Sequence, residues 1–372
     1  MMKPLKVLHC TESFGWSGGA AQSLWLASEL RKKGIENIFA CPAGGDLGQK
    51  VKTSDFKIID FNPASKMDLR LAFKMSKVID ELKPDVVHAH HPKAHNVCLV
   101  AKILSKHKPV LVVSRRVSHR LPDNFLARLK YKTRYVDGYL AVCEHVKRIL
   151  VNYGIEKERI EVVYSGVDRL KYHPEKKDIK FSRQLGIGEN DILISIIANY
   201  SSDKGQDILV KALSVLQGGS FKVLFAGRNT DGEELKSAFL KEGLSLDRGI
   251  FLGLRDDVAR ILNISDISVN SSRTEALAGS IRESLACGVP VVASDVGGNG
   301  EILKDGVNGF LFERGNYRQL AGKIEMLMKD PDLRKEFAAR GVRSVDEKFS
   351  VEKMAENTLN FYLNRIGLAG RR

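Results

Sequence analysis

The sequence predicts an α/β protein with two domains, each built on a parallel sheet that helices cover on both faces. The chain has 372 residues, which is long for one domain and suits two of about 170–190 residues each. Short apolar runs alternate with helical segments in two successive sets, a spacing typical of βαβ units. A polar stretch, RLKYHPEKKDIKFSRQ, separates the sets after Val167-Asp168. We place the domain boundary there.

The first set begins with a short apolar strand, Lys6–Cys10, followed by the loop TESFGWSGGA and a helix over 20–33. Further strands are expected at NIFAC, FKIIDF, DVVHAH, PVLVVS, YLAVC and IEVVYSG, with helices near 70–82, 94–106, 124–134 and 144–153. Gly15, Gly18 and Gly19 do not form G-x-G-x-x-G, so the dinucleotide fingerprint is missing. The glycine-rich turn still places backbone amides at the carboxyl edge of the sheet, although a purely structural turn explains it equally well.

The second set follows the same alternation. Strands are expected at ILISIIA, FKVLFAG, IFLGL, ISVNSS, PVVAS and GFLFE, with helices near 204–217, 232–243, 255–264, 276–287 and 317–329. A last helix is expected over Val351–Asn364, and the tail GLAGRR is expected to fray. The expected division is therefore 1–170, 171–350 and a terminal segment, 351–372.

Composition indicates a cytoplasmic protein. Hydrophobic residues make up 43% and charged residues 28%, as in ordinary soluble proteins. No apolar run approaches the roughly 18–20 residues of a membrane span, and MMKPLKVLHC enters a strand at once, so we expect no signal peptide. The five cysteines are scattered without C-x-x-C pairing, which favours reduced thiols and no zinc site. They are Cys10, Cys41, Cys98, Cys143 and Cys287.

The net charge of +14 is concentrated in the first half of the chain. Residues 1–170 hold 29 Lys and Arg against 17 Asp and Glu, and residues 101–136 hold ten basic residues with Asp123 as the one acid. Such a field attracts anionic lipid headgroups, phosphorylated saccharides or nucleic acid, although a solvated basic face is the simpler alternative. No aromatic-basic RNA motif accompanies it, so we do not expect nucleic acid as a partner.

The most informative stretch is Asn270 to Glu301, NSSRTEALAGSIRESLACGVPVVASDVGGNGE. It reads as a strand end, a polar loop, a helix up to Gly288 and a second strand. Glu275 and Glu283 are eight residues apart, a little over two helical turns, which places acids on roughly one face. Backbone N–H groups at the helix N-terminus would favour a phosphate beside them. The spacing alone also fits two solvated surface glutamates.

The wider context of these acids resembles the donor-binding motif of the GT4 family of retaining glycosyltransferases. The matching positions are Glu275, Leu277, Glu283, Leu285, Ala286, Gly288, Pro290, Val291, Val292, Ala293, Ser294, Gly297, Gly298 and Glu301. The chain departs from the motif at Ala276, where the family usually has Gly, and at Gly300, where Pro is common. The resemblance covers nearly the whole chain and is strongest over 195–312. It implies the GT-B architecture, two Rossmann-like domains facing across a cleft. In that architecture 1–170 would bind the acceptor, 171–350 would bind the nucleotide-sugar, and the helix in 351–372 would cross back towards the first domain.

The resemblance also implies a donor site for a nucleotide-sugar. Glu283 would bind the ribose, Glu275 the sugar hydroxyls, and Lys204 with the amides near Ala278, Gly279 and Ser280 the diphosphate. In NYSSDKG, Lys204 matches the family's phosphate-binding Lys, but Asn199 stands where an Arg is usual; Arg228 or Arg273 could supply that charge. Further expected donor contacts are the backbone of Leu254 and Arg255, which would touch the base, and Gly18 and Gly19. A Lys and helix amides that carry the leaving charge imply no metal requirement and no separate cofactor.

Histidines and arginines of the first domain are the candidate acceptor ligands. HAHHPKAH contains His88, His90, His91 and His95 after a strand, and we favour a structural or cleft-lining role over a metal site because no acid or cysteine accompanies them. Relatives carry a histidine after the next strand, where this chain reads SRRVSH. Arginine binds phosphate and carboxylate bidentately. The expected acceptor-binding residues are Arg115, Arg116, His119 and His90.

The sequence therefore predicts a retaining, metal-independent glycosyltransferase of the GT-B type. The expected acceptor is a lipopolysaccharide-type or lipid-linked saccharide of the cell envelope, reached at the inner face of an anionic membrane. A GT-B epimerase acting on a UDP-sugar and a catalytically silent basic binding protein remain as alternatives.

Overall fold

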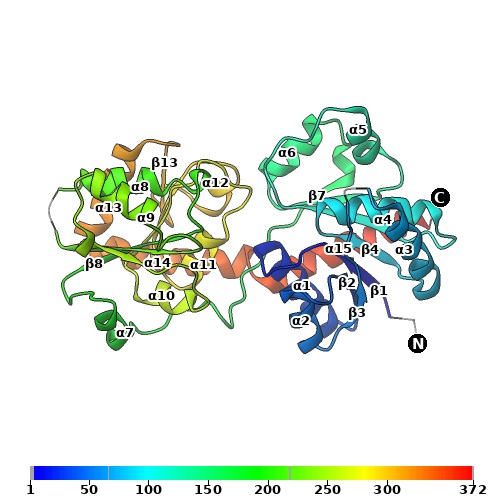
Figure 1. The fold of residues 1–372 in the computed structure, drawn as a ribbon, viewed down its shortest axis with the longest axis horizontal. Helices are drawn as coiled ribbons and strands as arrows, with labels where there is room; N and C mark the ends of the chain where they lie inside the picture. The colour runs from blue at the N-terminus through cyan, green and yellow to red at the C-terminus, as the bar shows by residue number, and fades with distance from the viewer. Residues whose placement is uncertain (1–3, 66, 218, 371–372) are drawn as a thin grey trace. The chain divides into compact units, whose positions relative to one another are not determined.

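The computed structural model describes residues 4–65, 67–217 and 219–370. The chain divides into two compact units. Unit 1 contains the chain up to Gly166 together with the segment from Val351 onward, and unit 2 runs from Val167 to Ser350. Each unit has its own parallel sheet with helices on both faces (Figure 1), which confirms the expected fold class.

Unit 1 holds a seven-stranded sheet in the order β3-β2-β1-β4-β5-β6-β7, with every neighbouring pair parallel. Its strands are β1 Lys6–Cys10, β2 Glu36–Cys41, β3 Lys57–Asp60, β4 Val86–Ala89, β5 Val110–Arg115, β6 Gly138–Ala141 and β7 Ile160–Val162. Its helices are α1 Gly18–Lys32, α2 Asp46–Thr53, α3 Leu69–Leu82, α4 Pro92–Leu104, α5 Phe125–Lys132, α6 Glu144–Asn152, η1 Lys157–Arg159 and α15 Val351–Ala369. The strand order reverses between β1 and β4, so the loops after these two strands flank the position where open α/β sheets bind ligands.

Unit 2 holds a six-stranded parallel sheet in the order β10-β9-β8-β11-β12-β13. Its strands are β8 Ile192–Ile197, β9 Phe221–Ala226, β10 Gly249–Phe251, β11 Ile267–Asn270, β12 Val291–Ser294 and β13 Phe310–Phe312. Its helices are α7 Ile179–Gln184, η2 Ser202–Lys204, α8 Gln206–Ser214, α9 Glu233–Lys241, η3 Leu246–Arg248, α10 Val258–Ile264, α11 Gly279–Ala286, α12 Asn299–Ile302, α13 Tyr317–Lys329 and α14 Pro331–Lys348. Here the order reverses between β8 and β11, which brings the loops 198–205 and 271–278 together.

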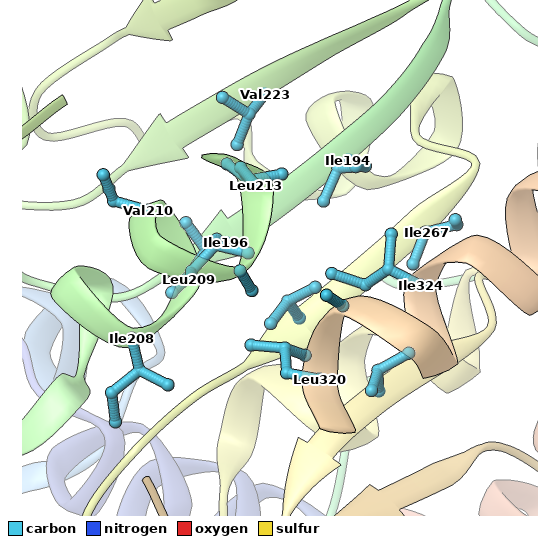
Figure 2. Packing of buried hydrophobic residues seen from close by; sticks show 14 of the residues in the cluster. Ile194, Ile196, Ile208, Leu209, Val210, Leu213, Val223, Ile267, Leu320 and Ile324 are labelled. Carbon is cyan, nitrogen blue, oxygen red and sulfur yellow. The ribbon is translucent and has the colours of Figure 1, made fainter. Parts of the chain in front are cut away.

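The core of unit 2 lies between its sheet and two helices (Figure 2). Ile194, Ile196, Val223 and Ile267 project from the strands, and α8 and α13 cover them with a second set of fully buried aliphatic side chains. These helix residues are Ile208, Leu209, Val210, Leu213, Leu320 and Ile324. Each buried side chain of this size contributes about 1.5–3 kcal/mol, so the sheet is a rigid base for its loops.

Helix α15 packs within unit 1 against α1 and β5. Met354, Phe361 and Tyr362 join the core there, and the ring of Phe361 lies so close to Gly138 that a Cβ atom at that position would meet it at 2.4 Å. The helix runs to Ala369, so the expected fraying of the GLAG segment is wrong; Arg371 and Arg372 lie outside the described residues. None of the helices in the described ranges is both long and apolar enough to cross a bilayer.

Several helices are absent from the sequence prediction. Helix α14 buries Phe337, Gly341 and Val345. These residues form a buried stripe of only one residue per turn, which is too narrow to give a clear amphipathic pattern in a highly charged segment of the sequence. Gly341 lets α14 approach α11, because a Cβ there would lie 2.8 Å from Leu285. The short helices α2 and α7 were also missed, and α7 lies in the polar stretch that marked the expected domain boundary.

Candidate functional site

Lys204 and Glu275 meet at the carboxyl edge of the unit 2 sheet. Lys204 ends η2 after β8, and its Nζ lies 2.6 Å from Oε1 of Glu275 in the loop after β11. The same oxygen accepts a hydrogen bond from Ser272 Oγ at 2.8 Å. Glu275 is largely buried, with 12% of its side chain exposed against 33% for Lys204. The two predicted site residues thus form one ion pair, with the ammonium group on the solvent side.

Glycines hold both halves of this pair in place. Gly205 follows Lys204 with φ +65°, and a Cβ there would lie 2.1 Å from the carbonyl oxygen of Ser271. Gly297 has φ +58°, and a Cβ there would lie 1.9 Å from the carbonyl oxygen of Glu275. In addition, the N–H of Gly298 donates to the Ala276 carbonyl at 2.9 Å. Only glycine tolerates such left-handed and close-packed positions, so the loop that carries Glu275 is fixed by backbone contact.

The N-terminus of α11 lies directly after this loop. Its N-cap Ala278 supplies no side-chain cap, and its first turn holds no acid. The amides of Gly279 and Ser280 are therefore available to an anion, which the helix dipole favours at this end. Ser280 is held from behind, because its Oγ accepts a hydrogen bond from Asn270 Nδ2 at 3.3 Å.

Glu283 lies one turn further along α11, where it is half-buried. Burial raises the pKa of Glu283, and the positive charges of Arg282 and Lys171 oppose that rise. Arg282 is 5% exposed. Burial lowers the pKa of Arg282 to about 10, and Glu283 and Glu275 oppose this change. Both predicted acids thus act on one buried guanidinium, which sequence reasoning missed because Arg282 looked like an ordinary helix residue.

The other predicted donor residues lie on neighbouring loops. Oδ1 of Asn199, which replaces the usual Arg, accepts the backbone N–H of Arg228 at 2.9 Å. Leu254 is 65% exposed, and Arg255 forms a two-pronged ion pair with Asp257. Arg273 forms a similar pair with Asp207, at 2.6 and 2.8 Å. Arg273 is therefore paired with Asp207, a carboxylate whose side chain is 44% exposed, and its suggested role as a second phosphate ligand stays a prediction.

A groove of about 610 Å³ lies on the same edge of unit 2. Its lining includes Asp207, Glu233 and Glu234, and its arginine is the one already paired with Asp207. Three carboxylates make this groove a poor seat for a diphosphate. The anion site is better described by Lys204 and the α11 amides, although the groove is larger.

Unit 1 contains a basic pocket of about 170 Å³ at the carboxyl edge of its sheet. It is lined by Gly19, His90, His91, Pro92, His95, Val113, Ser114, Arg115, Arg116, Val117, Tyr131 and Tyr139. Three of the four predicted acceptor-binding residues therefore line one pocket: Arg115, Arg116 and His90. His119 is exposed beyond this lining, and its carbonyl accepts a hydrogen bond from Arg115. We call this cavity the basic pocket.

The predicted glycines of unit 1 differ in their surroundings. Gly19 lines the basic pocket and packs against His91, so that a Cβ there would lie 2.8 Å from Nε2 of that ring. A Cβ on Gly18 would meet no atom within 4 Å. A Cβ on Gly19 would therefore force the His91 ring to shift, whereas the space beside Gly18 is open.

The predicted acceptor ligands leave out two residues at this pocket: His95, which is part of the lining and was expected to be structural or cleft-lining, and Lys130 beside it. His95 is 1% exposed, and both of its ring nitrogens lack a hydrogen-bond partner in the described part of the chain. Burial lowers its pKa well below the usual range. Lys130 lies at the pocket edge, where its Nζ donates to the Pro92 carbonyl at 3.0 Å. Burial lowers the pKa of Lys130 to about 8, with Glu12 opposing this change and Arg115 adding to it.

A hydrogen-bond chain behind the pocket holds Arg116. Arginine only donates, so Nη1 of Arg116 donates to His90 Nδ1, at 3.3 Å. His90 must then carry its proton on Nε2, which donates to His9 Nδ1 at 3.0 Å. His9 in turn donates from Nε2 to Asn37 Oδ1 at 2.9 Å. Each of the two imidazole rings, in its neutral form, therefore accepts one hydrogen bond and donates another. Burial lowers the pKa of His9 to about 4, which keeps that ring neutral.

A metal ion is the other possible use of these rings. His9, His88 and His90 offer ligand atoms within 4.8 Å of one another. Both nitrogens of His88 are also hydrogen-bonded, to Tyr362 and to Ser114. A cation would have to displace these bonds beside a buried guanidinium, and the group contributes no negative charge to compensate. The residues fit a hydrogen-bonded cluster better than a metal centre.

Two Rossmann-like units, one with an acid–lysine pair at a helix N-terminus and one with a basic pocket, are the arrangement expected of a GT-B glycosyltransferase. Residues 177–343 match the family model "Glycosyl transferases group 1", and residues 16–169 match "Glycosyltransferase Family 4". The chain belongs to the GT4 family of glycosyltransferases, as the sequence motif indicated.

Two curated relatives span most of the chain. D-inositol 3-phosphate glycosyltransferase of Acidothermus cellulolyticus is 30% identical over 99% of this chain and 89% of its own length. N-acetyl-alpha-D-glucosaminyl L-malate synthase of Bacillus anthracis is 27% identical over 84% of this chain and 82% of its own length.

Two solved structures share the fold over nearly the whole chain. The glycosyltransferase from Rickettsia africae ESF-5 has a TM-score of 0.87 at 24% identity, covering 98% of this chain and 99% of its own. Anabaena Alr3699/HepE in complex with UDP has a TM-score of 0.86 at 23% identity, covering 97% and 100%.

Proposed function

We propose that the protein transfers a sugar from a nucleoside-diphosphate sugar to an acceptor hydroxyl, with retention at the anomeric carbon. Its main support is the contact between Lys204 and Glu275 beside the open N-terminus of α11. An ammonium group and backbone amides stabilise a departing diphosphate, and an adjacent carboxylate suits sugar hydroxyls and a developing oxocarbenium charge. The Anabaena neighbour was solved with UDP and with UDP-glucose, which favours a UDP-sugar as donor.

The residues of the site bind different parts of the donor. Lys204 and the amides of Gly279 and Ser280 bind the diphosphate, Glu283 binds the ribose, and Glu275 holds the sugar. Arg282 compensates the charge of the two acids from beneath. Further donor contacts are proposed for Gly18, Gly19, Asn199, Leu254, Arg255 and Ala278.

Donor binding is tested by thermal shift. A cognate ligand stabilises the folded protein by mass action. At a ligand concentration a hundredfold above Kd, the free energy of unfolding increases by about 2.7 kcal/mol, and the melting temperature rises accordingly. We expect a UDP-sugar to shift wild-type protein and to leave a Lys204→Met/Glu275→Ala variant unshifted. If no nucleotide or nucleotide-sugar changes the wild-type transition, the donor site is assigned wrongly.

Stereochemistry and metal use need separate measurements. The anomeric proton of the product, followed by NMR, should keep the configuration of the donor; inversion would refute the retaining mechanism. Because Lys204 and helix amides can carry the leaving charge, transfer should survive EDTA. Activity that disappears with EDTA and returns with manganese would show that the leaving group needs a cation. Sugar epimers formed without acceptor would indicate the epimerase alternative.

We propose that the acceptor is anionic and binds in the basic pocket. Arg115 and Arg116 suit a phosphate or carboxylate, and His90 and the outer His119 complete the expected ligands. Two relatives named above act, by name, on inositol 3-phosphate and L-malate, which are both anionic. A Campylobacter jejuni relative, 27% identical over 78% of this chain, is named for a diphospho-undecaprenol acceptor.

Among anionic acceptors we favour a lipid-linked or lipopolysaccharide-type saccharide at the cytoplasmic face of the membrane. The basic charge of residues 101–136 suits that surface. A panel of soluble phosphorylated sugars, dicarboxylates and lipid diphosphate saccharides, each offered with the donor found by thermal shift, distinguishes the classes. Transfer to neutral saccharides alone would contradict an anionic acceptor.

A further inference from the structure

Helix α5 presents apolar side chains to solvent where a soluble protein normally presents polar ones. Phe125 is 73% exposed, Leu126 66% and Leu129 54%. At 100° per residue these three positions lie within about 100° of one another on one side of the helix. Arg128 and Lys132 border the same side. We call this side the outer face of α5.

The opposite side of α5 is firmly attached to unit 1. Ala127 and Tyr131 are buried, and the Tyr131 carbonyl accepts a hydrogen bond from Tyr139 Oη at 2.8 Å. Asn124 caps the helix by accepting the Ala127 N–H at 2.9 Å. Tyr153, the residue after α6, holds the preceding loop, because its Oη donates to the Pro122 carbonyl at 2.7 Å. The exposed apolar side chains therefore belong to a docked helix and point away from the core.

Charge distinguishes the outer face of α5 from another exposed apolar patch in unit 1. On α3, Leu69 is 60% and Phe73 54% exposed, but residues 67–85 contain four basic and four acidic residues. Residues 115–136 contain seven basic residues, and Asp123 is the one acid. Arg128 binds that acid at 2.7 Å. At the surface of an anionic bilayer, basic residues bind the lipid headgroups while apolar side chains enter the boundary beneath them. Water or nucleic acid would leave these apolar side chains exposed.

The same helix lines the basic pocket with its inner side. Tyr131 is part of the pocket lining, and Lys130 contacts the Pro92 carbonyl at its edge. We propose that the outer face of α5 docks on anionic bilayers, with Phe125, Leu126 and Leu129 entering the headgroup boundary. Docking would hold the basic pocket at headgroup level, where the phosphate of a lipid-linked acceptor lies. The inference deepens the membrane location proposed above but requires no donor chemistry.

Vesicle flotation of the full-length protein tests this docking. Wild-type protein should float with phosphatidylcholine vesicles that contain phosphatidylglycerol and remain unbound with phosphatidylcholine alone. Replacing Phe125, Leu126 and Leu129 by Ser should weaken binding at least tenfold. Replacing Arg120, Lys132 and Arg134 by Ser should abolish the preference for phosphatidylglycerol. All three of these basic residues are exposed and lie outside the proposed donor and acceptor contacts.

A matched control removes the apolar side chains of the other patch. The Leu69→Ser/Phe73→Ser variant should bind vesicles as wild type does. A Leu126→Trp variant should show a blue-shifted emission on adding anionic vesicles, which reports burial of the outer face directly. Equal vesicle binding by wild type and the α5 serine variant, or an unshifted Trp emission, would overturn the proposal.

Two further measurements distinguish membrane docking from a dimer interface and from the proposed donor site. If size-exclusion chromatography shows a dimer that the α5 serine variant breaks while vesicle binding persists, the outer face is a self-interface and membrane docking is refuted. The thermal shift by UDP-sugar should be unchanged in the α5 serine variant. Loss of flotation with an intact thermal shift supports docking independently of catalysis, and a missing thermal shift with intact flotation contradicts the proposed donor site alone.

Discussion

Replacing Gly297 by Ala should inactivate the donor site through the backbone of Glu275. Gly297 has φ +58°, and its added Cβ would lie 1.9 Å from the Glu275 carbonyl oxygen, whereas real Cβ contacts under 3.0 Å essentially never occur. The loop with Glu275 must therefore withdraw by about 1 Å, a misplacement that costs on the order of 10²-fold in rate when it affects a reacting geometry. The left-handed backbone adds a destabilisation of about 1–2 kcal/mol.

Gly306 supplies the matched control. It has φ +71°, and a Cβ there would meet no atom within 4 Å, so Gly306→Ala carries the backbone cost without the clash. We expect both variants to lose melting temperature, Gly297→Ala by the larger amount. Sugar transfer, or slow hydrolysis of the donor found by thermal shift, should fall about a hundredfold in Gly297→Ala alone. Equal activities of the two variants would refute the view that backbone contact positions Glu275.

Three other predictions concern single charged or titratable side chains. Lys204→Met should weaken UDP binding at least tenfold in calorimetry, because charge-assisted hydrogen bonds to the diphosphate contribute about 1.5–3 kcal/mol. Binding of uridine, which has no phosphate, should be unchanged. As a control, Lys211→Met on the exposed side of α8 should bind UDP normally. Glu283→Gln should raise the melting temperature of the unliganded protein and reduce the shift by UDP, since burial raises the pKa of that carboxyl and its charge is costly without a ligand. Wild-type stability should fall on acidification, because the pKa of His9 drops from 6.5 to about 4 on folding and the unfolded chain takes up the proton first. From pH 7 to pH 5 this ring alone removes about 2 kcal/mol, so chemical denaturation should show a shallower acid loss in His9→Gln, and an equal loss would exclude His9 as its source.

The local sequence determined the alternation of elements and the donor motif. All thirteen strands in the described part of the chain were expected, because strands of parallel sheets are short apolar runs bounded by polar turns. The resemblance to the GT4 family predicted Glu275, Glu283 and Lys204 as donor ligands, and close backbone approach and anion binding give a physical reason for residues of these types at fixed offsets. Helices with a narrow buried stripe, such as α14, were missed because most of their residues face water.

Only the tertiary structure decided which side chains meet. The spacing of 71 residues between Lys204 and Glu275 gives no sign of a 2.6 Å contact, which arises because β8 and β11 are neighbours in the sheet. Likewise, the orientation of Arg116 depends on His9 and Asn37, which the pairing of β1 with β2 and β4 brings together. The outward apolar side of α5 is invisible in FLARLKYK, since a helical pattern of apolar residues does not reveal which side the sheet covers. Pattern follows from local backbone geometry, whereas burial and partners depend on long-range packing.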